Sequence, residues 1–146
     1  IWYEDYNATR FVGDNKTRLE PIDDAAHVNW KGDWRMPTNA DWKELLNSDN
    51  CTWEWTSQNG VNGYKVTSKK DGYTENSIFL PAAGYCFDTD NGYSGLNDAG
   101  KCGQYWSSSL YGNNPNSARN MNFSSTFFKC DNQGREWGLS VRPVCP

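Results

Sequence analysis

The stretch Met36-Pro37-Thr38-Asn39-Ala40-Asp41-Trp42 carries the strongest local signal in the chain. Thr38 can cap the first turn of a helix, and Asp41 follows at the position that completes a reciprocal capping box. Apolar residues then recur at helical spacing as far as Leu46. The stretch therefore predicts an amphipathic helix of about three turns that ends near Ser48.

Beyond this helix, the sequence follows the two-residue period of β-strands. Trp53 and Trp55 alternate with polar residues, and Gly60 supplies a turn before the chain returns along residues 64–67. Further short runs lie at residues 77–80, 105–108, 118–123, 126–129 and 139–142. The polar segment from Gly84 to Gly103 is predicted to be a long loop. One helical region followed by an antiparallel meander predicts the α+β class.

The 146 residues are enough for one domain, which we expect to span residues 1–146. The hydrophobic fraction of 36% includes 8 Trp, 8 Tyr and 6 Phe, so apolar burial should rest on a few large rings. Residues 1–20 lack a clear periodicity and are predicted to form an irregular N-terminal arm. Because Ile1 is not an initiator Met, we expect a processed or truncated product.

Charge and hydropathy argue against two classes of partner. The net charge is −4, and the Lys and Arg residues are scattered along the chain. Binding to a nucleic acid duplex requires grouped cations, so we expect no nucleic acid partner. The longest apolar runs fall far short of the roughly 20 residues that span a bilayer, which predicts no transmembrane segment.

The five cysteines do not show the spacing of a zinc site. They favour disulfides in an oxidising compartment, and hence a location outside the cytoplasm. We predict a disulfide between Cys86 and Cys102, which would close a loop rich in Gly, Asp and Asn. Cys145 has two candidate partners, Cys51 and Cys130, and an odd number of cysteines leaves one thiol over.

Several elements of the sequence, taken in order, resemble the Fibrobacter succinogenes major paralogous domain. They are Asp23–Trp30, Trp34–Thr38 with Asp41 and Trp42, Cys51–Val66, Phe79–Tyr85, Tyr105–Ser109 and Ser140–Val144. The resemblance implies a C-type-lectin-like fold in a bacterial secreted protein or lipoprotein, located extracellularly or on the outer-membrane surface. It informs fold far better than function. Members of that family commonly carry a longer N-terminal stretch than the arm present here.

A calcium-dependent sugar site would require tripeptides such as Glu-Pro-Asn and Trp-Asn-Asp, which the sequence lacks. Asn114-Pro115-Asn116 resembles the Glu-Pro-Asn tripeptide only in part and is interpreted as a turn. Oxygen-bearing side chains alternate in Asp88–Gly92, but the glycine is misplaced for an EF-hand loop and no Glu closes it. We therefore expect no metal site and no cofactor, with a structural calcium ion in this loop as the open alternative.

His27 is the only histidine, so any Ser–His or Cys–His nucleophilic scheme would have to use it. It lies in an apolar stretch that favours a packed, structural role. Carboxylates such as Asp23 and Asp24 show no pairing that identifies a glycoside-hydrolysing site. Arg35 and Arg142 are predicted to pair with carboxylates and to hold segments together. We therefore predict no catalytic residues and no enzymatic activity.

The C-terminal half combines aromatic rings with amide and guanidinium groups, which are side-chain types suited to recognition. If Met121 and Phe123 face inward, strand alternation turns Asn120 and Asn122 toward solvent. We predict ligand-binding roles for Trp106, Tyr111, Asn114, Asn116, Arg119, Asn120, Asn122, Asn132, Arg135 and Trp137.

These residues predict a non-catalytic extracellular binding or adhesion module. Its C-terminal strands and loops would recognise a cell-surface protein or carbohydrate. The alternative is a structural or assembly component of a cell-surface complex, such as a pilus tip or stalk, in which the domain docks onto sister domains of the same assembly.

Overall fold

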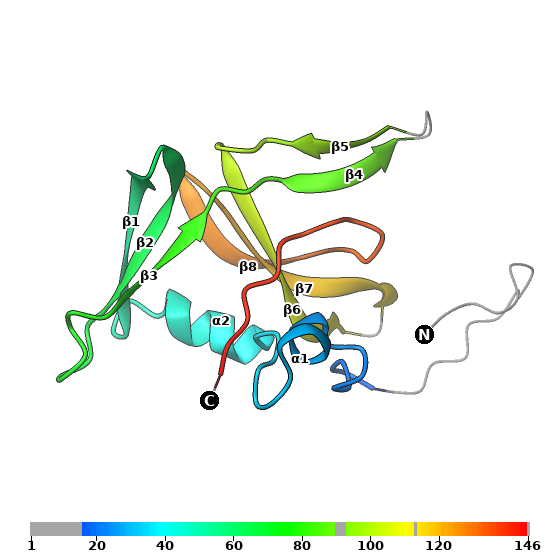
Figure 1. Cartoon of the computed structure of the whole chain (residues 1–146), viewed down its shortest axis with the longest axis horizontal. Coiled ribbons are helices and arrows are strands. Elements are labelled where there is room, and N and C mark those ends of the chain that lie inside the picture. The colour runs from blue at the N-terminus through cyan, green and yellow to red at the C-terminus, as the bar shows by residue number, and fades with distance from the viewer. Residues whose placement is uncertain (1–15, 90–92, 113, 146) are drawn as a thin grey trace, which may run out of the picture.

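The computed structural model describes residues 16–89, 93–112 and 114–145, which form two helices and eight strands. The helices are α1 (Ala25–Trp30) and α2 (Asn39–Leu46). The strands are β1 (Cys51–Gln58), β2 (Val61–Ser68), β3 (Ser77–Pro81), β4 (Tyr85–Thr89), β5 (Tyr93–Asn97), β6 (Cys102–Tyr111), β7 (Asn114–Ser124) and β8 (Phe127–Gly134). They pair antiparallel in three sheets, ordered β1-β2-β3, β4-β5 and β6-β7-β8, which confirms the α+β class (Figure 1).

The two helices lie along one side of the sheets, and the β4–β5 hairpin projects from the other side (Figure 1). The segment after β8 passes across the β6-β7-β8 sheet and is tied to it by backbone bonds. Ser140 forms a parallel bridge with Tyr105, and Val144 exchanges hydrogen bonds with Arg35 at 2.9 and 3.0 Å. The C-terminal segment therefore connects β6 to the loop that precedes α2. No helix within the described ranges is both long enough and apolar enough to cross a membrane.

The capping box that begins α2 is formed as predicted. Thr38 Oγ1 accepts a hydrogen bond from Asp41 N at 3.1 Å, and the Asp41 carboxylate accepts one from Thr38 N at 2.7 Å. Arg35 binds the same carboxylate at 2.6 Å, which confirms its predicted structural role. The helix is shorter than predicted and ends at Leu46, because its C-cap residue adopts an extended conformation.

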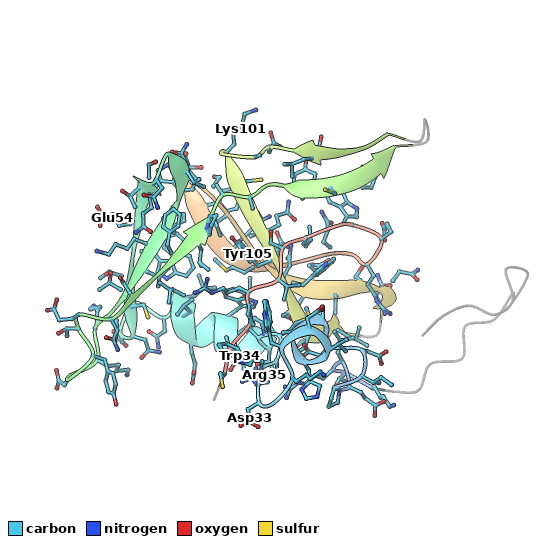
Figure 2. The ribbon with its side chains drawn as sticks, viewed as in Figure 1. Asp33, Trp34, Arg35, Glu54, Lys101 and Tyr105 are labelled. Carbon is cyan, nitrogen blue, oxygen red and sulfur yellow. The ribbon has the colours of Figure 1, made fainter. Side chains whose placement is uncertain are left out.

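Aromatic side chains from two sheets form the core, as the composition predicts. Tyr64 of β2 meets Phe123 of β7 edge to face, with ring centroids 5.4 Å apart, and Trp55 of β1 packs against both rings. Tyr105 of β6 stacks on Phe123 at 5.9 Å and lies at the centre of the molecule (Figure 2). Its hydroxyl donates to Pro81 O at 2.7 Å, and burial raises its pKa to about 12.

Helix α2 closes this core through two tryptophans. Trp42 is buried and its ring lies 6.1 Å from that of Tyr105. Trp53 of β1 donates from Nε1 to Leu45 O at 2.8 Å, which joins the first sheet to the helix. The helix therefore contacts both three-stranded sheets.

The segment from Gly84 to Gly103 was expected to be a loop, and this expectation was wrong, because it contains the β4–β5 hairpin. Tyr85 and Phe87 are two residues apart, a strand period that the surrounding Asp, Asn and Gly residues obscured. Gly84 precedes the hairpin with φ of 73°, and a Cβ there would lie 2.1 Å from Asn97 O. Only glycine fits at this position.

Buried Asp24 organises the region around α1, a helix that the sequence analysis did not predict. Its carboxylate accepts hydrogen bonds from Ala26 N and His27 N at the start of the helix, at 2.9 and 3.1 Å. It also accepts from Met36 N, at 2.9 and 3.0 Å to its two oxygens. One carboxylate therefore caps α1 and fixes the strand-like approach to α2.

The end of the N-terminal arm is held against β6 by an isolated bridge. Leu110 N donates to Thr17 O at 2.9 Å, and Leu19 N donates to Ser108 O at 2.8 Å. Arg18 thereby forms an antiparallel bridge with Ser109. Residues 1–15 of the predicted arm lie outside the described residues.

Gly103 should be essential to the core, because a Cβ at this position would lie 2.2 Å from the Phe123 ring. We expect Gly103→Ala to lower the free energy of unfolding by about 1–3 kcal/mol, the usual cost of overpacking. Gly95→Ala is the matched control, because its Cβ would meet nothing within 4 Å. Urea unfolding of both variants measures the difference. Equal stability of the two would contradict this account of the core.

Asp41 should make the stability of the fold pH-dependent. Burial works to raise its pKa, but hydrogen bonds from Arg35 and Thr38 together outweigh burial and lower the pKa from 3.8 to about 2. Because the folded-state value is depressed, the stabilisation is present above about pH 4 and is lost as the pH falls toward 2. Asp41→Asn should cost about 1–2 kcal/mol at pH 7, and this cost should shrink in acid.

Chemical unfolding of wild type and Asp41→Asn between pH 2 and 7 tests this expectation. Exposed Asp71→Asn serves as the control, with no comparable change in stability across the series. A cost that stays constant down to pH 2 would show that the ionised carboxylate is not what stabilises this part of the fold.

Candidate functional site

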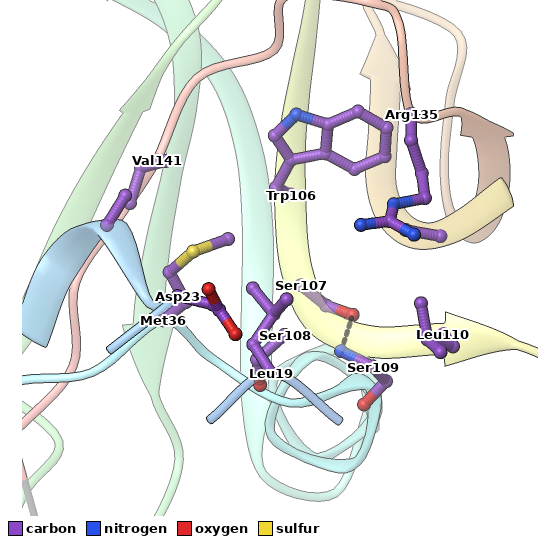
Figure 3. A pocket seen from close by; sticks show the side chains of 12 residues that line it. Leu19, Asp23, Met36, Trp106, Ser107, Ser108, Ser109, Leu110, Arg135 and Val141 are labelled. Atoms are coloured by element: carbon purple, nitrogen blue, oxygen red, sulfur yellow. Dashed lines mark hydrogen bonds between the residues drawn. The ribbon is translucent and has the colours of Figure 1, made fainter. Parts of the chain in front are cut away.

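A pocket of about 250 Å³ opens where the N-terminal arm, the start of α1, β6 and the segments after β8 meet (Figure 3). Strand β6 supplies one wall, from Trp106 to Leu110. The other walls include Leu19, Asp23 and Arg135. Parts of the chain that are distant in sequence therefore converge on one small cavity, which is lined by apolar, hydroxyl and charged side chains.

Three consecutive serines of β6 line the pocket with hydroxyl groups. Ser107 Oγ accepts a hydrogen bond from Ser109 N at 3.1 Å (Figure 3), and Ser109 Oγ accepts one from Asn39 N at 3.1 Å. Ser108 Oγ donates to Pro37 O at 3.4 Å. Because a hydroxyl that accepts can still donate its proton, Ser107 and Ser109 each retain a donor for a ligand.

Two side chains of opposite charge lie on different sides of the pocket. Figure 3 places Asp23 beside Met36 on one side, and Arg135 beside the indole of Trp106 on the other. The backbone N of Arg135 donates to Asn116 O at 2.9 Å, which fixes this residue against β7. The pocket thus presents a carboxylate, a guanidinium group and a flat aromatic wall.

The loop that carries Arg135 is held by Trp137. The Trp137 ring packs against Tyr85 and Phe87 of β4, with centroids 5.0 and 4.4 Å away. Next to it, Gly138 and Cys86 exchange backbone hydrogen bonds at 2.7 and 2.8 Å. The β4–β5 hairpin therefore anchors the loop that forms one wall of the pocket.

Of the ten residues predicted to bind a ligand, the structure brings only Trp106 and Arg135 together in the pocket. Trp137 supports the same loop from behind through its contacts with β4. Tyr111 and Arg119 form a separate pair, in which the guanidinium lies 4.5 Å from the ring centroid.

Four further predicted residues lie on strands β7 and β8. The turn predicted at Asn114-Pro115-Asn116 is wrong, because these residues begin strand β7. Asn114 Oδ1 accepts a hydrogen bond from Asn116 N at 3.0 Å, and both residues are exposed. Asn132 N donates to Asp131 Oδ1 at 3.0 Å. Asn122 of β7 lies opposite Gln104 of β6 and Lys129 of β8. None of these four amides lines the pocket within the described part of the chain.

The predicted solvent exposure of Asn120 is wrong. Met121 and Phe123 are fully buried, as expected, but Asn120 on the opposite face is only 1% exposed. Its Nδ2 donates to Gln104 Oε1 at 3.3 Å, while its Oδ1 has no hydrogen-bond partner among the described residues. The segment after β8 passes over this part of the sheet, so β7 is buried on both faces at Asn120 and Met121 (Figure 1).

Sequence reasoning missed Asp23, Ser107 and Ser109 as pocket residues. The serines were placed in a strand, and a run of three serines beside Trp106 could have suggested a polar wall. Asp23 was weighed only as a hydrolytic carboxylate. No local pattern could place it near Trp106, because their proximity depends on the pairing of the arm with β6.

Within residues 16–89, 93–112 and 114–145, no group of three or more His, Cys, Asp or Glu side chains could hold a metal ion. Asp90, Asn91 and Gly92 of the candidate calcium loop lie outside these ranges. His27 lies on α1, where its backbone N binds Asp24. The expectations of no cofactor and no catalysis remain predictions.

The predicted disulfide between Cys86 and Cys102 is not formed, and all five cysteines are free in the structure. Tyr85 and Cys86 are neighbours on β4, so their side chains point to opposite faces of the hairpin. Burial, and then the negative charges of Asp98 and Cys102, raise the pKa of Tyr85. Cys86 exchanges backbone hydrogen bonds with Gly138, whereas the Cys102 carbonyl accepts one from Gly84 N at 2.8 Å.

Removing the Trp137 ring should release the loop that carries Arg135. We expect Trp137→Ala to speed hydrogen exchange at the amides of Gly138 and Cys86 at least tenfold, because local opening becomes easier. Trp34→Ala removes a partly exposed indole far from β4 and is the matched control. Exchange measured by NMR or mass spectrometry reports the difference. Unchanged protection in Trp137→Ala would show that the ring is not the anchor.

The family described as Domain of unknown function (DUF8237) matches residues 64–144. No curated protein and no solved structure matches the chain. The matched region runs from β2 into the C-terminal segment and includes the wall of β6, Ala118 and Arg135. Because the match covers more than half of the chain, this protein belongs to the DUF8237 family.

Proposed function

We propose that this protein is a non-catalytic, extracellular binding module, and that its pocket at β6 captures a cell-surface glycan or protein. The observation that carries the proposal is the convergence of Trp106, Arg135 and Asp23 on one cavity. An aromatic wall gives contact area at low entropic cost, while the charged groups and serine hydroxyls give directional hydrogen bonds. These groups suit recognition of a ligand that carries both an apolar face and polar substituents.

Within this proposal, the fold is C-type-lectin-like and belongs with the Fibrobacter succinogenes major paralogous domain. The resemblance of the sequence elements and the observed α+β class both support this assignment. The corresponding location is the extracellular space or the outer-membrane surface, as a secreted protein or lipoprotein. No cofactor is required by the binding role.

A second candidate is an assembly component that docks onto sister domains. It is favoured by apolar side chains exposed around α1, among them Ile22 at 80%, Val28 at 52% and Trp30 at 54%. The ring of Trp34 lies 6.3 Å from that of Trp30. Exposed apolar groups of this size often mark protein contacts.

Filling the pocket tests the binding proposal. Ala118 lines the pocket from β7, so Ala118→Leu should occupy part of the cavity. We expect this variant to bind at least tenfold more weakly than wild type to the ligands that wild type captures on a glycan array or from cell-surface fractions. The larger side chain would overpack the pocket or displace ligand contacts, at a cost of roughly 1–3 kcal/mol.

Ala40→Leu, an exposed position on α2, is the matched control and should bind as the wild type does. Thermal unfolding confirms that both variants are folded. Full binding by Ala118→Leu would exclude the pocket as the binding site. Stable complexes that depend on Trp30 and not on Ala118 would favour the assembly role.

A further inference from the structure

We infer that the pocket binds a single acidic sugar ring, of the uronic acid type, at the end of a glycan chain. This inference rests on the proposed function and deepens it by naming the class of ligand. Four features of the pocket support it: its volume, the closed edge of β6, the placement of its charges and its aromatic wall.

The volume limits the ligand to one ring. About 250 Å³ lies below the roughly 300–1,000 Å³ of pockets that enclose drug-sized ligands. A single pyranose unit therefore suits the cavity, whereas a longer oligosaccharide would extend into solvent. The terminal unit of a chain would enter the pocket, and the next unit would lie at its mouth.

The edge of β6 beside the pocket argues against an extended peptide. Extended peptides commonly bind by adding a strand to an open sheet edge. Here Thr17 and Leu19 already hydrogen-bond to Leu110 and Ser108 at 2.9 and 2.8 Å, so that this part of the edge is occupied. A compact ring needs no such edge.

The charged and hydroxyl groups match the substituents of an acidic sugar. A guanidinium group binds a carboxylate through two parallel hydrogen bonds, and Arg135 presents such a group beside Trp106 (Figure 3). On the other side, the Asp23 carboxylate can accept hydrogen bonds from ring hydroxyls. Ser107 and Ser109 retain donors for the ring oxygens.

The indole of Trp106 completes the match. One face of a pyranose ring presents C–H groups, and a flat aromatic ring gives it a large, rigid contact area. Trp106 is half-buried, and its pairing with Asn120 across the sheet fixes its position. The pocket therefore offers a separate contact for each part of the ligand: its carboxylate, its hydroxyls and its apolar face.

Titration with methyl β-D-glucuronide and with neutral methyl β-D-glucoside tests the inference, using saturation-transfer NMR and calorimetry on the full chain. We expect the glucuronide to bind at least tenfold more tightly. Arg135→Gln should abolish this preference, because losing a charge-assisted, two-bond contact costs roughly 10- to 100-fold in affinity. Asp23→Asn should weaken both sugars.

Lys101→Gln is the matched control, because it removes one exposed positive charge at the end of the molecule far from α1 (Figure 2). It should leave both affinities unchanged. A preference for glucuronide that Lys101→Gln reduces as much as Arg135→Gln would reflect net charge and would overturn the inference.

Other results separate this inference from the proposed function. Suppose that both sugars bind equally, that Ala118→Leu abolishes this binding and that Arg135→Gln leaves it unchanged. This result would overturn the inference of an acidic ligand, while the proposal of a glycan-binding pocket would stand. Capture of a protein or of a peptide carboxyl terminus, with no affinity for sugars, would overturn the inference and keep the binding role. Failure of wild type to bind any of these ligands would overturn both.

Discussion

The edge-to-face contact between Tyr64 and Phe123 lies at the centre of the aromatic packing that joins two separately hydrogen-bonded sheets, and the rest of the structure is built around it. Tyr64 comes from the β1-β2-β3 sheet and Phe123 from the β6-β7-β8 sheet. The close approach of the Phe123 ring to β6 requires a residue without a side chain, which Gly103 provides. Few aliphatic residues are needed, because each ring buries a large area.

The pocket depends on this core through a second set of restraints. The aromatic core fixes β6, whose outer half carries Trp106 and the serines. Asp24, which is 4% exposed, then ties α1 to Met36, and so places Asp23 and Met36 against that strand. The pocket lining comes from several chain segments, and backbone hydrogen bonds restrain Leu19 and Arg135 as well.

Local chemistry explains which parts of the fold could be predicted. The capping box of Thr38 and Asp41, and the alternation of Trp53 and Trp55, are short-range patterns, and both were confirmed. The β4–β5 hairpin was missed because its polar composition outweighs the period set by Tyr85 and Phe87. A period-two pattern shows that the two faces of a strand differ in polarity. It cannot show that a later segment of the chain will cover the polar face.

Sequence patterns predicted even less of the candidate site, because its residues meet through tertiary contacts. Trp106 and Arg135 were predicted from residue type, and the pocket contains both. Asp23 reaches the site only through tertiary contacts, and Asn120 is removed from solvent by the segment after β8. Residue type therefore indicated two of the side chains that line the pocket, while the location of the pocket depended on contacts between distant parts of the chain.

The pairing of Arg18 with Ser109 has a consequence for how the protein behaves at high concentration. An unpaired strand edge presents free amide and carbonyl groups, onto which a second molecule can add its own strand and begin to aggregate. Thr17 and Leu19 satisfy these groups at Ser108 and Leu110. The arm therefore covers this edge of the sheet. Its loss would expose the edge of β6 and favour self-association through that strand.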